Sequence, residues 1–206
     1  MSVSFDEETF VAAARAGDFR KVQGPKTELI EAIRANQSVR GGDPREALRE
    51  LTELTARLLE VGRVGVWVLD EAQTRLSNLD LLVVDSGRHT SGMAIAQADA
   101  PEYFSLLLAG EVLTIDDAMA DPRTRELARG YLPTYGVTAM IDAPILIERK
   151  LAGVVCGEHL GGVRRWEGWE RLLAGSLAEC AGVAIAVART HEGEGTRGRW
   201  RTLSVG

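Results

Sequence analysis

The segment between Met140 and His159 is the sequence feature that most constrains how this chain can fold. Two runs of apolar residues flank a polar turn at residues 148–150, a pattern that predicts an antiparallel hairpin. Polar groups appear only at Asp142 in the first run and near Glu158 at the end of the second. A carboxylate among apolar neighbours needs a hydrogen-bond partner or a ligand to offset its lost hydration. We therefore expect a covered sheet with a small polar site at one end of the hairpin.

The composition favours a soluble cytoplasmic protein. The 206 residues are enough for one domain with extensions, and a hydrophobic fraction of 45% is enough for a core. A net charge of −6 argues against nucleic-acid binding, which needs clustered Lys and Arg. We find no apolar run near the roughly 18 residues of a membrane span and no signal-peptide pattern, so we expect no membrane insertion. Cys156 and Cys180 lie in apolar runs and suit reduced, buried thiols.

Three parts are predicted along the chain. Residues 1–42 form an N-terminal helical extension with two short helices, the second beginning near Pro25, and Gly41-Gly42 marks the boundary. Residues 43–191 form the main domain, and the Gly- and Arg-rich residues 192–206 form a flexible tail.

The main domain has a clear order of predicted elements. Asp43-Pro44 begins a helix, because an acid followed by proline is typical of a helix start. Two strands, an irregular crossover, the hairpin and a long helix to about Thr190 follow. Within the crossover, Asp121-Pro122 predicts a further helix start. The remaining expected elements are strands at 63–70, 75–85, 93–95 and 111–115, and a helix opening at 99–102.

Several local motifs accompany this order of elements, namely Leu58–Trp67, Ser91–Met93, Asp116–Thr124, Met140–Pro144 and Gly153–His159. Together they resemble the GAF domains found beside bacterial histidine kinases and other signalling proteins. The resemblance covers about residues 44–190. It implies an α/β (α+β) fold with a GAF/PAS-like central antiparallel sheet flanked by helices, to which this chain adds its helical extension.

The resemblance leaves the cofactor unknown. GAF domains of the phytochrome type attach a bilin through a crossover cysteine, and the enzymatic members, free methionine sulfoxide reductases, use several cysteines there. Residues 86–136 contain no cysteine, which argues against both. The signature of cyclic-nucleotide GAF domains is not found. Haem would need an axial histidine, for which His89 and His159 are the candidates.

Any ligand is expected between the sheet and the crossover. Asp142 and Glu158 would contact it from the sheet and His89, Tyr103, Tyr131 or Tyr135 from the crossover, since apolar walls with a few polar groups are typical of ligand sites. Two carboxylates would favour hydrogen-bond donors or positive charge over a phosphate. The alternatives are that Asp142 accepts backbone N–H groups, that His159 bonds Glu158 or the backbone, and that the aromatic residues are core.

These observations predict a non-enzymatic sensory or regulatory domain in bacterial signal transduction, because no nucleophile–base arrangement, phosphate loop or metal-ligand set is found. It would bind a small molecule and act on a signalling partner protein in trans. The alternative is a degenerate GAF scaffold that acts through protein–protein contacts without a ligand. We also expect a homodimer through the terminal helices, with an isologous patch formed by Leu51, Leu54, Leu177 and Val187.

Overall fold

The structure is a computed structural model that describes residues 6–195. Its helices and strands are, in chain order, α1 (Glu7–Arg15), α2 (Phe19–Ala35), α3 (Gln37–Arg40), α4 (Arg45–Leu59), β1 (Arg63–Leu69), β2 (Arg75–Val83), β3 (Arg88–Thr90), β4 (Ala94–Ala96), α5 (Pro101–Leu108), β5 (Leu113–Ile115), α6 (Tyr131–Tyr135), β6 (Val137–Ile147), β7 (Lys150–Leu160) and α7 (Gly168–Gly195). In the main domain, the predicted order of a helix, two strands, a mixed crossover, a two-strand hairpin and a long helix is confirmed.

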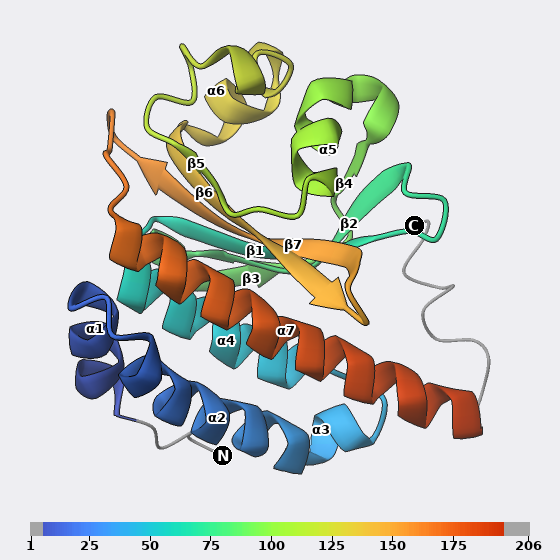
Figure 1. Ribbon diagram of the computed structural model, residues 1–206. Coiled ribbons are helices and arrows are strands. Elements are labelled where there is room, and N and C mark those ends of the chain that lie inside the picture. Colours follow the sequence, from blue (N-terminus) through green and yellow to red (C-terminus); the bar gives the residue numbers. More distant parts are fainter. Residues whose placement is uncertain (1–5, 196–206) are drawn as a thin grey trace.

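All strands belong to one antiparallel sheet. The strand order is β3-β2-β1-β7-β6-β5, and β4 pairs with the outer part of β2. In Figure 1, α5 and α6 lie on one side of the sheet, α4 and α7 on the other, and α1–α3 form an outer layer below α4 and α7. The sheet is therefore covered on both faces, as the apolar hairpin strands require.

Successive residues of the central strands point alternately into two separate hydrophobic cores, one on each face of the sheet. Val66 and Val155 pack toward α4 and α7, whereas Trp67 and Val154 pack toward the crossover that contains α5 and α6. This alternation follows from the period of two along a strand. The crossover face carries the buried polar groups described below.

The loop at the tip of the β6–β7 hairpin has two residues, whereas the sequence predicted a turn of three, residues 148–150. Only Glu148 and Arg149 form the turn, and both have left-handed backbone angles, with φ of 51° and 65°. Two consecutive positive φ values in a two-residue loop are typical of a type I′ turn, which matches the twist of the strands. Lys150 already belongs to β7.

The N-terminal extension is helical, but it contains three helices instead of two. The second begins at Phe19, where the Asp18 side chain accepts from the backbone N–H groups of Arg20 and Lys21. The expected start near Pro25 was wrong, because that residue lies inside α2. The extension packs on α7, and an ion pair of 2.8 Å joins Lys26 Nζ to Glu179 Oε2.

This packing buries the patch predicted for a homodimer. Leu51, Leu54 and Leu177 are buried within the chain, and Val187 is half-buried against the same core. The expectation that these four side chains meet a symmetry mate is therefore wrong for this conformation, because their partners belong to their own chain. Homodimerisation itself stays a prediction and requires another surface or a displaced extension.

Helix α7 runs to Gly195, past residue 192 where the tail was expected to begin, and residues 196–206 lie outside the described part of the chain. Within Gly168–His191 it is apolar enough to cross a membrane by length and composition, with a mean hydropathy of 1.6, which the sequence analysis overlooked. It packs against β6 and α4, so its apolar side chains serve the core.

Two further features complete the fold. The helix expected after Asp121 is only a 3-10 turn, Pro122–Thr124, followed by a second such turn and the short α6.

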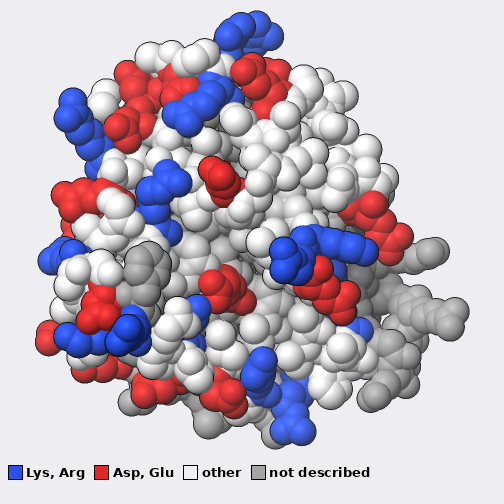
Figure 2. Space-filling view, in the orientation of Figure 1, with Lys and Arg blue, Asp and Glu red and all other residues white. Residues whose placement is uncertain are grey.

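On the face shown in Figure 2, Lys and Arg side chains are interspersed with Asp and Glu side chains. This mixed charge agrees with the modest net charge of the sequence.

Candidate functional site

Adjacent strands bring one row of side chains together on the crossover face. Arg63 of β1 lies opposite Glu158 of β7, and Gly65 lies opposite Cys156. Cys156 in turn lies opposite Asp142 of β6. The hydrogen-bond register of three central strands therefore sets the positions of the polar groups.

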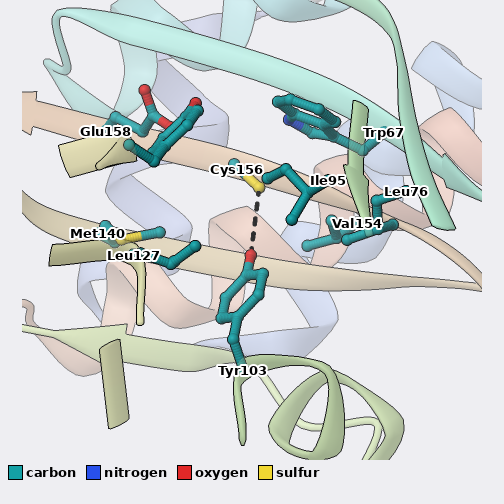
Figure 3. A pocket seen from close by; sticks show the side chains of 10 residues that line it. Trp67, Leu76, Ile95, Tyr103, Leu127, Met140, Val154, Cys156 and Glu158 are labelled. Atoms are coloured by element: carbon teal, nitrogen blue, oxygen red, sulfur yellow. Dashed lines mark hydrogen bonds between the residues drawn. The ribbon is translucent and has the colours of Figure 1, made fainter. Parts of the chain in front are cut away.

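Two members of this row, Cys156 and Glu158, border a small cavity between the sheet and the crossover (Figure 3). Its volume is about 10 Å³, close to the space that a single water molecule needs. Its walls are mostly apolar or aromatic, and they are formed by Trp67, Leu76, Ile95, Tyr103, Leu127, Tyr131, Met140, Val154, Cys156 and Glu158.

Asp142 is fully buried beside this cavity. Tyr103 donates its hydroxyl to Asp142 Oδ2 at 2.8 Å and lies 3.8 Å from Cys156 Sγ, the contact drawn in Figure 3. Burial raises the pKa of Asp142 to about 7, and the hydrogen bond from Tyr103 opposes that shift by stabilising the carboxylate. Burial also raises the pKa values of Tyr103 and Cys156, so both carry their protons at neutral pH.

Glu158 belongs to a second buried group. Its Oε2 accepts from Arg63 Nε at 2.7 Å and its Oε1 accepts from the Tyr131 hydroxyl at 2.6 Å. The Arg63 guanidinium also lies 4.2 Å from the centre of the Tyr135 ring. Burial raises the pKa of Glu158, while the positive charge of Arg63 lowers it. This group holds α6 against the sheet.

Two buried polar atoms have no hydrogen-bond partner among the described residues. They are Asp142 Oδ1, an acceptor when the carboxyl group is ionised, and Trp67 Nε1, a donor. The indole nitrogen lies over Gly65, where a Cβ atom would approach it to 2.5 Å. Buried polar atoms are usually satisfied, so these two need an explanation. Trp67 belongs to the cavity lining, whereas Asp142 lies behind Tyr103 and Cys156, which do line the cavity.

The structure brings together most of the predicted site residues. Tyr103 and Tyr131 reach Asp142 and Glu158 from the crossover, while Tyr135 stacks at 5.0 Å from Tyr131 and contacts Arg63 instead of the cavity. Asp142 accepts a hydrogen bond from the Tyr103 hydroxyl, and not from backbone N–H groups as the alternative supposed. Glu158 pairs with Arg63, so the suggested pairing with His159 was wrong.

His89 does not belong to this site. It lies on the other face of the sheet, where its Nδ1 is 2.9 Å from Asp80 Oδ2 and its Nε2 is 3.3 Å from Glu53 Oε1. Thr52 of α4 also donates to Asp80, at 2.6 Å. The expectation that His89 contacts a ligand from the crossover was wrong, because β3 turns this side chain toward α4.

Sequence reasoning missed the cation and the indole of the site. Arg63 is the first residue of a strand, and its sequence context is that of an ordinary surface residue. Only the register of β1 with β7 shows that it lies opposite Glu158. The available signal was the alternation of Arg63, Gly65 and Trp67, which places all three on one face of β1. That face was not distinguished from the other, because both faces of β1 are buried.

Residues 43–185 match the sequence model of the GAF domain. The chain belongs to the GAF family. A search of curated protein sequences finds no match to this chain.

Solved structures with the same fold include several GAF domains. One is the GAF domain of the Acinetobacter phosphoenolpyruvate-protein phosphotransferase, with 12% identity, a TM-score of 0.62, and coverage of 84% of this chain and 95% of that chain. Another is the blue-light absorbing form of the PixJ GAF domain from Thermosynechococcus elongatus, with 20% identity, a TM-score of 0.60, and coverage of 77% and 92%. At these identities the similarity establishes the fold.

An enzyme is also among the similar structures. The free methionine-R-sulfoxide reductase from Neisseria meningitidis, in complex with its substrate, has 13% identity, a TM-score of 0.60, and coverage of 91% of this chain and 96% of that chain. GAF domains are generally sensory rather than catalytic, but this neighbour shows that the fold also occurs in enzymes.

Proposed function

We propose that this GAF domain is a cytoplasmic, non-enzymatic sensory or regulatory module of bacterial signalling, and that it binds a small molecule between the sheet and the crossover. Ligand binding would change the packing of α7 and thereby the interaction with a partner protein in trans. The observation that carries this proposal is the cavity between the sheet and the crossover, whose mostly apolar lining includes the polar groups of Tyr103, Tyr131 and Glu158 and the indole of Trp67, whose Nε1 is buried and unsatisfied.

The chemistry of the site supports binding over catalysis. A nucleophilic cysteine needs a lowered pKa, whereas burial raises the pKa of Cys156. Glu158 is held by Arg63 and Tyr131 and serves a structural contact. The phenol and thiol groups remain protonated and are suited to donate hydrogen bonds.

The size of the cavity favours a second function, a GAF scaffold that works only through protein–protein contacts. A volume of about 10 Å³ does not admit a molecule much larger than water. A larger ligand would have to displace Leu127 and Tyr131 of the crossover. The two functions therefore differ in whether the crossover can separate from the sheet.

Native mass spectrometry of the protein purified from its own host distinguishes them. A retained small molecule supports the sensory function, and its loss in a folded Asp142→Ala variant would place it at this cavity. A thermal-shift screen of cell metabolites gives a second test, because a ligand at about 100 times its dissociation constant adds roughly 2.7 kcal/mol to native stability. The scaffold function is favoured if both measurements find nothing.

A further inference from the structure

Asp142 is a buried carboxyl group whose immediate described neighbours carry no positive charge. The groups that face it are Tyr103 of α5 and, on β7, Cys156 and Glu158. Tyr103 donates a hydrogen bond of 2.8 Å, and a thiol is a weak donor. Glu158 is acidic, and the nearby cation, Arg63, is already paired with it at 2.7 Å. The surroundings of Asp142 therefore offer hydrogen bonds but no compensating charge.

A carboxylate in such surroundings holds a proton more tightly than it does in water. Burial penalises the charged form, and a hydrogen bond from a neutral donor offsets that penalty only in part. Burial accordingly raises the pKa of Asp142 to about 7, although the hydrogen bond from Tyr103 opposes this rise. Asp142 thus exchanges a proton with the solvent around neutral pH.

We propose that Asp142, Tyr103 and Cys156 form a proton-binding site that makes the attachment of α5 to the sheet depend on pH. This inference goes beyond the proposed function, because its stimulus is the proton and it requires no organic ligand. The proton comes from the solvent and binds to a carboxylate oxygen of Asp142. The carboxylate then becomes a neutral carboxyl group.

The hydrogen bonds of this site accommodate the proton without a displacement of heavy atoms. With Asp142 ionised, the Tyr103 hydroxyl donates to Oδ2. With Asp142 protonated, its O–H donates to the Tyr103 oxygen, and the Tyr103 hydroxyl donates to Cys156 Sγ. That contact of 3.8 Å, drawn in Figure 3, allows either atom to be the donor. The closed structure is therefore compatible with both forms, but only the ionised form buries a charge.

The buried charge favours separation of α5 from the sheet. Tyr103 belongs to α5 and Asp142 to β6, so movement of α5 away from the sheet would admit water to the carboxylate. A solvated Asp142 has the ordinary pKa of 3.8, so the separated state releases a proton that the closed state keeps. By linkage, the equilibrium constant for separation rises about tenfold per pH unit between roughly pH 4 and 7 and is constant above that.

Infrared spectroscopy of the full chain detects the proton directly, because the C=O stretch of a protonated carboxyl group and the S–H stretch of a thiol lie outside the amide bands. Between pH 5 and pH 8 we expect a carboxyl band to disappear with a midpoint near pH 7, together with a shift of the Cys156 S–H band. Cys180, a buried thiol in the core on the other face, is the internal control, and its band should not move. Asp142→Asn should abolish both changes, whereas Asp85→Asn, at an exposed position, should leave them intact.

Tyr103→Phe gives an independent variant that keeps the aromatic ring. It removes the donor that stabilises the carboxylate, so the midpoint of the carboxyl band should move to higher pH. An unchanged midpoint would contradict the assignment of Tyr103 to the proton-binding site. This variant also carries the test if Asp142→Asn does not fold.

Amide hydrogen exchange measures the attachment of α5. We expect the amides of α5 to open more often than the whole protein unfolds. After correction for the intrinsic exchange rate, their opening constant should be about 100-fold larger at pH 8 than at pH 5, because two pH units separate pH 5 from the pKa of about 7. In Asp142→Asn the opening constant of α5 should not depend on pH.

Three results would overturn the inference. The first is that no carboxyl band disappears between pH 5 and pH 8, and the second is that the band still disappears in a folded Asp142→Asn variant. The third is that α5 exchanges only when the whole chain unfolds, for then the proton changes global stability alone. Each of these results leaves small-molecule binding standing, because native mass spectrometry and the thermal-shift screen test it separately.

Discussion

At the scale of single residues, Asp142 lowers the stability of the folded protein near neutral pH. Its folded-state pKa of about 7 lies above the ordinary value of 3.8. Between these values the folded protein keeps a proton that the unfolded chain has lost. Stability from this group is therefore highest below about pH 4, decreases as the pH rises toward 7, and is constant above that.

The variant Asp142→Asn should remove this dependence, because an amide does not ionise. Its stability relative to wild type should therefore be greater at pH 8 than at pH 5 by about 2.7 kcal/mol, since wild type loses about 1.36 kcal/mol for each of the two pH units between 5 and 7. Urea unfolding at the two pH values measures the difference. The exposed Asp85→Asn serves as control, and equal effects of both variants at both pH values would contradict the assignment.

The Arg63–Glu158 pair should behave differently from surface ion pairs. Arg63→Met leaves Glu158 buried without its cation, and breaking a buried pair costs about 3–5 kcal/mol. The double variant Arg63→Met with Glu158→Leu should recover a large part of that loss, because no charge is left without a partner. Denaturant unfolding of the single and double variants tests this.

A matched surface pair gives the comparison. Arg34 and Glu31 form an exposed ion pair at 3.2 Å on α2, and such pairs contribute about 0–1 kcal/mol. Arg34→Met should therefore change stability only slightly. Equal losses for the two arginine variants would show that the buried pair has no special energetic role.

At the scale of elements, the β6–β7 turn is strained by its sequence. Glu148 and Arg149 occupy left-handed backbone angles, which cost a residue with a Cβ atom roughly 1–2 kcal/mol. Replacing them with Asn-Gly, the residues preferred in type I′ turns, should stabilise the protein by about 1 kcal/mol. Thermal unfolding measures the gain.

Alanine distinguishes backbone strain from the loss of two charged side chains. Glu148→Ala with Arg149→Ala removes both charges and keeps both Cβ atoms, so it should give no gain. A gain from this variant equal to that of Asn-Gly would refute the strain argument.

The sequence predicts the elements better than it predicts their contacts. The hairpin, the first helix of the main domain and the order of the strands follow from local periodicity, and they are confirmed. Asp142 and Glu158 could be selected because polar groups stand out in apolar strands, and Tyr103 and Tyr131 because they are ring side chains of the crossover. The pairing of Arg63 with Glu158, and the position of His89 beside Asp80, depend on register and on strand orientation. Local sequence does not encode these long-range relations.

At the scale of the whole molecule, the N-terminal extension covers helices that the family match assigns to the domain. The family match begins at residue 43, so α1–α3 lie outside it. Besides the Lys26–Glu179 pair, Arg15 lies 4.8 Å from the centre of the Trp169 ring, and Arg57 of α4 reaches Glu7 at 2.9 Å. Contacts to both α4 and α7 hold the extension in place.

Reversing one of these charges should loosen the extension. Lys26→Glu places two carboxylates together at Glu179, and we expect faster amide hydrogen exchange in α2 and a concentration-dependent dimer in light scattering as Leu177 becomes accessible. The exchanged pair, Lys26→Glu with Glu179→Lys, should restore wild-type behaviour. Unchanged exchange in the single variant would show that apolar packing alone holds the extension.

The length of α7 gives the molecule a lever. Its 28 residues form a rod of about 42 Å at the usual rise of 1.5 Å per residue. The rod rests on β6, the strand that carries Asp142. For a straight rod of this length, a tilt of about 5° at one end displaces the other by about 4 Å. A small tilt of α7 where it packs on β6 would therefore become a displacement of several ångströms at the far end of the helix.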